Sequence, residues 1–154
     1  ISVVAVSLTQ QWFGDSVSIQ RWRDIWLNEG FATYSEWLYS ERTGGDTAAQ
    51  LADQYYQQIP ADAEFWRIPP ADPGAAGVLD SPVYVRGAMA LQALRTAVGD
   101  EDFFAALRAW PAERRGGNGS VQDFLGVVER ISGEQVDDVA DTWLFRPERP
   151  GSAP

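Results

Sequence analysis

The sequence predicts an all-α fold, and three observations support that prediction. Apolar residues recur at helical spacing along nearly the whole chain, rather than in the alternation that is typical of half-buried strands. Gly and Pro interrupt these periodic stretches where helices would end. The chain has 154 residues, of which 45% are apolar, and this is enough for one packed core. We therefore expect a single helical domain over residues 1–146 and a frayed tail over residues 147–154.

Three helices are expected in the first part of the chain. The first covers about residues 2–13, and the second covers about residues 24–42 and ends at a pair of glycines, a helix stop signal. The second helix is apolar on most sides, which is typical of a central helix with neighbours all round. The third covers about residues 47–58, with Asp46 as its expected N-cap.

Residues 59–80 contain four Pro and two Gly, so we expect an irregular loop there. A loop of this length is either a functional rim or a simple wrap around the core. Four further helices are expected over about 82–98, 100–110, 120–132 and 136–145. Ser120 and Asp123 form a capping-box pattern at the start of one of them.

The composition excludes several kinds of chemistry. There is no His and no Cys, and all twelve basic residues are Arg, so imidazole bases, thiolates, disulfides and lysine Schiff bases are absent. A formal charge of −10 argues against binding to nucleic acid or to an anionic membrane surface. We expect neither as a partner.

The hydropathy of the chain predicts no membrane span. No stretch approaches 18 uninterrupted apolar residues, and the segment that begins at Ile1 lacks the basic flank of a signal peptide. The expectation is a water-soluble chain, and its localisation stays open.

Two short motifs carry a resemblance to a known family. Residues 11–14 read Gln-Trp-Phe-Gly, and residues 28–32 read Asn-Glu-Gly-Phe-Ala. Both resemble the catalytic helices of the alanyl-aminopeptidase-like zinc peptidases of the gluzincin group. The resemblance extends over nearly the whole chain and implies a multi-helix domain like the C-terminal helical subdomain of thermolysin-like peptidases. It also implies zinc as cofactor and peptide hydrolysis as activity.

The resemblance assigns site positions residue by residue. In the family an H-E-x-x-H helix precedes Gln-Trp-Phe-Gly, and eighteen residues separate the second His from the third zinc ligand. Gln10 stands at the second His position, Val6 at the first, and Ser7 at the catalytic Glu. Glu29 falls on the third-ligand position. Tyr84, in Ser-Pro-Val-Tyr-Val-Arg-Gly-Ala, takes the position of the family tyrosine that hydrogen-bonds the oxyanion.

At these positions the chain departs from the family. Val6 cannot bind a metal, Gln10 offers only a neutral amide oxygen, and Ser7 cannot replace a Glu as general base. We expect no tight zinc site, no cofactor and no peptide hydrolysis. The family's sheet subdomain, with its amine-binding Glu, is also expected to be missing from this chain.

The leading hypothesis is a metal-free, catalytically inactive helical subdomain, an engineered minimal scaffold rather than a natural pseudoenzyme. One alternative is a repurposed cleft, in which Glu29 acts as base and Tyr84 as donor in metal-independent hydrolysis or proton transfer. Another is a module that binds a peptide or protein at the former cleft or at the 59–80 loop. The structural alternative is that Glu29 is a satisfied carboxylate and Tyr84 a packed phenol.

Other conspicuous residues have structural explanations. Asp100, Glu101 and Asp102 suit a helix start, as do Asp137, Asp138 and Asp141. The Arg114-Arg115 pair is expected on a solvated face. Four tryptophans are expected in the core: Trp12, Trp26, Trp37 and Trp143.

Overall fold

The computed structural model describes residues 17–19, 24–114 and 117–154. Most of them are helical, which confirms the all-α prediction. The longer helices are α2 (Trp26–Arg42), α3 (Ala48–Gln58), α5 (Gly87–Val98), α6 (Asp100–Glu113) and α7 (Val121–Ser132). The shorter ones are η3 (Glu64–Arg67), α4 (Gly74–Gly77), η4 (Pro82–Arg86), α8 (Asp137–Ala140) and η5 (Asp141–Phe145). The helix expected over residues 2–13 lies outside the described residues.

A two-stranded ladder accompanies these helices. β1 (Val17–Ile19) pairs in parallel with β2 (Gly117–Gly119), and Val17 lies opposite Gly117. The sequence did not predict it, because three residues are too few for a two-residue period to stand out. The ladder brings the chain just before α2 beside the chain just before α7.

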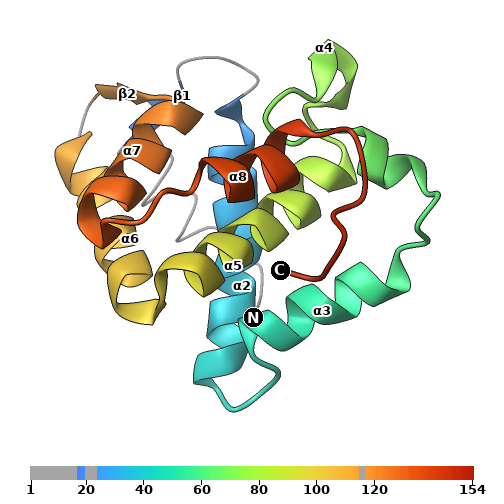
Figure 1. Cartoon of the computed structure of the whole chain (residues 1–154), viewed down its shortest axis with the longest axis horizontal. Coiled ribbons are helices and arrows are strands. Elements are labelled where there is room, and N and C mark those ends of the chain that lie inside the picture. Colours follow the sequence, from blue (N-terminus) through green and yellow to red (C-terminus); the bar gives the residue numbers. More distant parts are fainter. Residues whose placement is uncertain (1–16, 20–23, 115–116) are drawn as a thin grey trace.

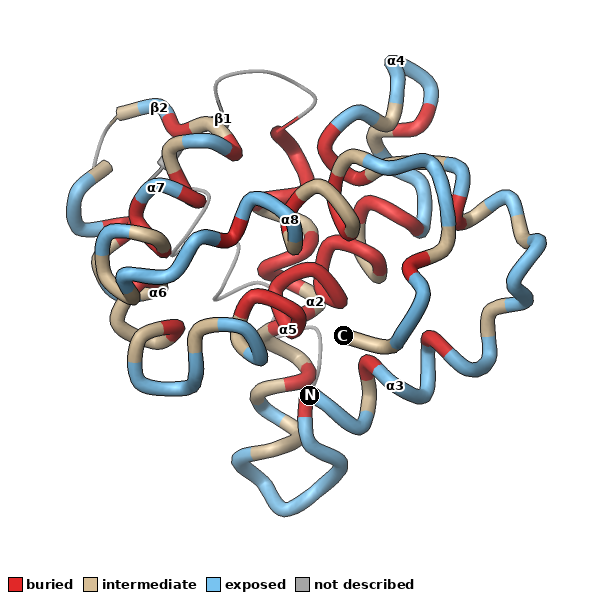
Figure 2. Tube along the Cα trace, viewed as in Figure 1, coloured by how far each residue is buried: buried red, intermediate tan, exposed pale blue. Residues whose placement is uncertain are grey.

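The centre of the fold is the pair α2 and α5, which cross near the middle of the molecule (Figure 1). Buried residues concentrate along these two helices, with α3 on one side and α6 and α7 on the other (Figure 2). Trp26, Phe31 and Tyr34 of α2 are almost fully buried. The expectation of a central helix with neighbours all round is therefore correct for α2.

Two helices, α3 and α7, begin with a side-chain cap. At α3 the N-cap is Thr47 and not Asp46, which corrects the sequence expectation by one residue. The Thr47 hydroxyl accepts the Gln50 backbone N–H, and the Gln50 side chain accepts that of Thr47. These two hydrogen bonds give acceptors to the backbone N–H groups of Thr47 and Gln50, and the side chain of Asp46 accepts neither of them. The capping box of Ser120 and Asp123 at α7 is confirmed.

Two expected helices are divided in the structure. The helix expected over 82–98 begins as the π-helical turn η4 and continues as α5, and the one expected over 136–145 is α8 followed by the π-helical turn η5. The 59–80 segment contains η3 and α4 and is not wholly irregular. Side-chain periodicity does not separate a π turn from an α turn over five residues, so these changes escaped the sequence analysis.

In the segment 147–154, where a frayed tail was predicted, Arg149 and Pro150 pack against α3, whereas Pro147 and Glu148 are exposed. The Tyr56 hydroxyl donates to the Pro150 carbonyl at 2.6 Å, and Pro150 is buried. The Arg149 guanidinium lies 4.1 Å from the centre of the Tyr56 ring. Its Nη2 also donates to the Tyr56 carbonyl at 3.0 Å. The tail therefore closes over α3.

Arg86, at the end of η4, is fully buried and holds several segments together. Its guanidinium donates only to backbone carbonyls. The acceptors are Trp66 at 2.7 Å, Thr142 at 3.2 Å, Trp143 at 2.9 Å, Arg146 at 2.6 Å and Glu148 at 3.1 Å. Burial lowers the pKa of Arg86 to about 10, against the opposing charge of Glu148, so the group is cationic at neutral pH.

Within the described part of the chain, no helix combines the length and the apolar character that a bilayer crossing requires.

Candidate functional site

Glu29 lies in the first turn of α2 and is half-buried. Its backbone N–H donates to the Ile25 carbonyl at 3.0 Å, which fixes the residue inside the helix. A negative charge in the first turn is favoured by the helix dipole. The sequence thus places one carboxylate at the start of the central helix.

Tyr84 lies in the middle of η4 and is also half-buried. Burial raises the pKa of the Tyr84 phenol, and the charge of Glu29 and a side-chain hydrogen bond with Glu29 raise it further. The phenol is therefore protonated at neutral pH, and Glu29 lies close enough to influence its titration. The structure brings these two residues, 55 positions apart in sequence, into one site.

Two glycines allow this approach. A Cβ on Gly30 would lie 3.0 Å from the carbonyl carbon of Gly87, and a Cβ on Gly87 would lie 3.2 Å from the Cα of Gly30. Both distances are shorter than ordinary van der Waals contact. Because Gly30 follows Glu29 and Gly87 is one turn after Tyr84, the contact between these backbones sets the separation of the two side chains.

Hydrogen bonds and ion pairs also join α2 and α5 farther along the two helices, away from Gly30 and Gly87. The Tyr34 hydroxyl donates to the Gln92 side-chain oxygen at 2.8 Å. Arg95 of α5 forms ion pairs with Glu41 at 3.0 Å and with Asp100 at 2.8 Å. Hydrogen bonds from Arg95 hold the pKa of both carboxyls below their ordinary values. The crossing is thus fixed at both ends.

Comparison with known proteins identifies the family. The profile of the Peptidase family M1 domain matches residues 1–143. The chain belongs to peptidase family M1. Aminopeptidase M1-D of rice is 30% identical over an alignment of 151 positions, which covers 91% of this chain and 17% of that protein. Aminopeptidase N of Streptomyces lividans is 31% identical over 157 residues, covering 89% of this chain and 17% of the relative.

Solved M1 structures share the fold. The M1 zinc metallopeptidase of Deinococcus radiodurans superimposes with a TM-score of 0.79 at 34% identity, over 99% of this chain and 35% of that one. A mutant of the same enzyme bound to a Tyr-Ser-Ala substrate gives a TM-score of 0.80 at 34% identity, over 99% of this chain and 34% of the other. The chain therefore spans under a fifth of the curated M1 relatives and about a third of the solved chains.

The site residues expected from the M1 resemblance divide into two groups. Val6, Ser7 and Gln10 lie outside the described residues, so their roles stay predictions. Glu29 and Tyr84 are described and lie together. Their roles as base and donor, or as a satisfied carboxylate and a packed phenol, stay predictions.

The donor set does not fit the zinc of M1 peptidases. Catalytic zinc takes three protein ligands from His, Cys, Asp or Glu, and this chain has no His and no Cys. Among the described residues, no three side chains of these types are grouped to hold a metal ion. Glu29 is the one residue at a family ligand position that keeps a ligand side chain.

The other residues singled out in the sequence have structural roles where they are described. Trp26, Trp37 and Trp143 are buried in the core as expected, and Trp12 lies outside the described residues. Arg114 is half-buried and pairs with Asp123 at 2.8 Å, so its side chain is less solvated than expected. Asp100 lies at a helix start and pairs with Arg95.

Sequence reasoning did not single out Arg86, Gly30 or Gly87. Arg86 is the one charged residue in the apolar stretch 82–94, a signal of a buried and fully bonded cation. The two glycines occur inside helical stretches, where a glycine without a turn indicates close backbone approach. The sequence does not show which carbonyls Arg86 binds or which backbone each glycine contacts.

Proposed function

We propose that this chain is a non-catalytic member of family M1, a helical unit that keeps the shape of the peptidase cleft without its metal chemistry. The observation that supports this most is the Glu29–Tyr84 pair. Glu29 is the one carboxylate that the chain keeps at a family ligand position, and it interacts with Tyr84. Val6, Ser7 and Gln10 supply neither further ligands nor a general base.

Hydrolysis of a peptide bond needs an activated water. Without a metal ion, the pKa of water stays near its bulk value, and a serine hydroxyl does not remove a proton from it at neutral pH. A protonated Tyr84 can donate a hydrogen bond, but donation alone does not generate a nucleophile. The residues at hand therefore support binding rather than cleavage.

Peptide binding at the former cleft is part of the proposal, and one solved relative supports it. A mutant of the Deinococcus radiodurans relative is bound to a Tyr-Ser-Ala substrate, so the M1 fold holds a peptide in that protein. In this chain the corresponding cleft would include Val6, Gln10, Glu29 and Tyr84. A short peptide there would compete with Glu29 for the Tyr84 hydroxyl.

A reversal experiment tests the proposal. The triple variant Val6→His, Ser7→Glu, Gln10→His restores the family ligands, and we expect it to bind zinc with Glu29 as third ligand. Adding Glu29→Gln should weaken that binding by about tenfold or more. Glu36→Gln, on the same helix, is the matched control and should leave zinc affinity unchanged. A triple variant that binds no more zinc than the parent chain would contradict the assumed register.

A second candidate function is favoured by the same pair. Tyr84 and Glu29 are a proton donor and an acceptor in a half-buried site, an arrangement that suits metal-independent proton transfer or ester cleavage. Hydrolysis of an activated ester that is lost in both Glu29→Gln and Tyr84→Phe, and kept in Glu36→Gln, would establish it. Rates equal to buffer alone would exclude it.

The interpretation as an engineered minimal scaffold is also a proposal. It is supported by the sequence at the family motif. Val6, Ser7 and Gln10 replace three functional residues, while the adjacent Gln-Trp-Phe-Gly segment is intact. A genomic reading frame that encodes the same three replacements would contradict it.

A further inference from the structure

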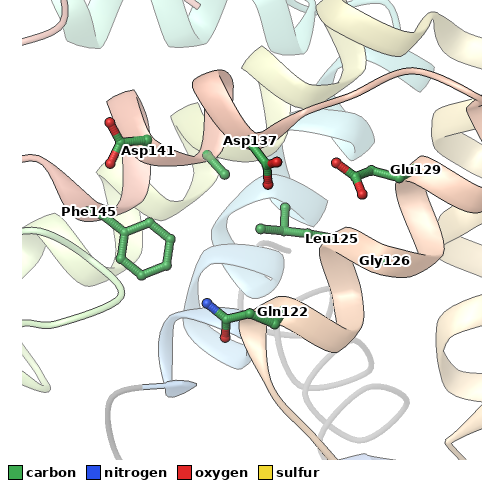
Figure 3. Close-up of a pocket in the computed structure, with 8 residues that line it drawn as sticks. Gln122, Leu125, Gly126, Glu129, Asp137, Asp141 and Phe145 are labelled. Carbon is green, nitrogen blue, oxygen red and sulfur yellow. The ribbon is translucent and has the colours of Figure 1, made fainter.

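A groove of about 330 Å³ lies between α7 and the α8–η5 segment (Figure 3). Its size is at the low end for ligand sites and suits one side chain rather than a large ligand. Leu125, Ala140 and Phe145 form its apolar part. The complete lining is Gln122, Leu125, Gly126, Glu129, Asp137, Ala140, Asp141 and Phe145.

Three carboxylates surround the apolar part. Figure 3 shows those of Asp137 and Glu129 near one another beside Leu125, with Asp141 farther along the same rim. Glu129 accepts the backbone N–H of Val136 at 3.1 Å, and Asp141 pairs with Arg146 at 2.7 Å. Within the described ranges, the Asp137 carboxylate makes no hydrogen bond or ion pair. Asp137 is therefore an exposed carboxylate without a protein partner among the described residues, and the rim of the groove is net negative.

Gly126 is a second and independent feature of the groove. It lies inside α7, where glycine is less favourable than any residue except proline. A Cβ added there would meet no heavy atom within 4 Å, and its φ is not positive, so neither packing nor backbone conformation requires a glycine. The missing side chain keeps the groove open on the α7 side.

We propose that this groove binds an arginine side chain presented by a partner polypeptide. The carboxylates can accept the guanidinium N–H groups, and the Phe145 ring and Leu125 can pack against its planar face and methylene stem. The net charge of −10 attracts a basic segment from a distance. This inference does not depend on the proposed function, because Glu29 and Tyr84 take no part in it.

The probe is a short labelled peptide with blocked termini, uncharged except for one central arginine, and its binding is measured by fluorescence anisotropy. The matched peptide carries citrulline, which has nearly the same shape and no charge. We expect saturable binding of the arginine peptide and binding of the citrulline peptide that is at least about fivefold weaker. No saturable binding, or equal binding of both peptides, would overturn the proposal.

Variants locate the site on the protein. Gly126→Leu should fill the groove and weaken binding about tenfold or more, whereas Gly151→Leu, also in open space, should leave it within about twofold. Asp137→Asn should weaken binding about fivefold, and Asp62→Asn, which makes the same charge change elsewhere, should not. If Gly126→Leu and Asp137→Asn both left the affinity unchanged, general charge attraction would explain the binding. That result would overturn the proposal that the peptide binds in this groove.

Discussion

Tyr84 of η4 lies close enough to Glu29 of α2 for the charge of this carboxylate to raise the pKa of the Tyr84 phenol. The two side chains meet because Gly30 and Gly87 let the backbones of these elements touch. In an M1 peptidase that binds zinc, the carboxylate at this position would be a metal ligand. Here the negative charge of the carboxylate stabilises the protonated form of the Tyr84 phenol.

The first prediction concerns the titration of Tyr84. Burial is the larger cause of its raised pKa, and Glu29 is the second. Glu29→Gln removes the charge, so the pKa of Tyr84 should fall but stay above that of free tyrosine. The measurement is ultraviolet absorbance of tyrosinate against pH, with Tyr84→Phe to isolate the signal. An unchanged pKa in Glu29→Gln, or an equal fall in Glu36→Gln, would contradict the pairing.

The second prediction contrasts two glycines. Gly30→Ala places a Cβ 3.0 Å from the Gly87 backbone, and this overpacking should destabilise the fold by about 1–3 kcal/mol. Gly126→Ala adds the same atom where nothing lies within 4 Å, and it should stabilise α7 by about 0.5–1 kcal/mol. Urea denaturation measures both. If both substitutions changed the free energy of unfolding in the same direction, the fold would not depend on the close Gly30–Gly87 backbone contact.

The third prediction concerns the buried cation. Arg86→Met leaves five backbone carbonyls without their donor and should reduce the free energy of unfolding by about 3 kcal/mol or more. Arg86→Lys, with three donors, should have an intermediate effect. The exposed Arg67 is the control, and Arg67→Met should change stability by less than about 0.5 kcal/mol. Equal unfolding midpoints for Arg86→Met and Arg67→Met would refute the proposed role.

The fourth prediction concerns alkaline pH. Burial raises the pKa of Tyr34 to about 12, with Arg95 opposing, whereas an unfolded tyrosine titrates near 10. Between these values the unfolded chain loses its proton first, so stability is complete below about pH 10 and falls as pH rises toward 12. The loss should be about 2 kcal/mol. Unfolding free energies measured across this window should show a shallower decline for Tyr34→Phe than for the parent chain.

Helical periodicity and cap residues were sufficient to predict most of the fold. The central position of α2 followed from its nearly continuous apolar surface, and Ser120 with Asp123 marked the start of α7. The packed tail was not predicted, because its stability comes from Arg86 and Tyr56, which are far from it in sequence. Contacts between residues that are far apart in sequence leave no pattern in the local sequence from which they could be predicted.

The candidate site was predicted in part. Glu29 and Tyr84 were both named from their motifs as residues of one cleft, and the structure places them close together. The Gly30–Gly87 contact also depends on the crossing of two helices, which periodicity does not specify. The α7–α8 groove was missed because its carboxylates have ordinary explanations as helix-start residues when taken one by one.

Zinc affinity of the unmodified chain tests the central claim most directly. The purified protein is freed of metal, incubated with equimolar zinc and analysed by isothermal titration calorimetry and by metal content after gel filtration. We predict substoichiometric zinc after filtration and no heat of tight binding, because Glu29 is left with no partner ligands at the family positions. Stoichiometric zinc bound with submicromolar affinity, and lost in Glu29→Gln, would contradict the account.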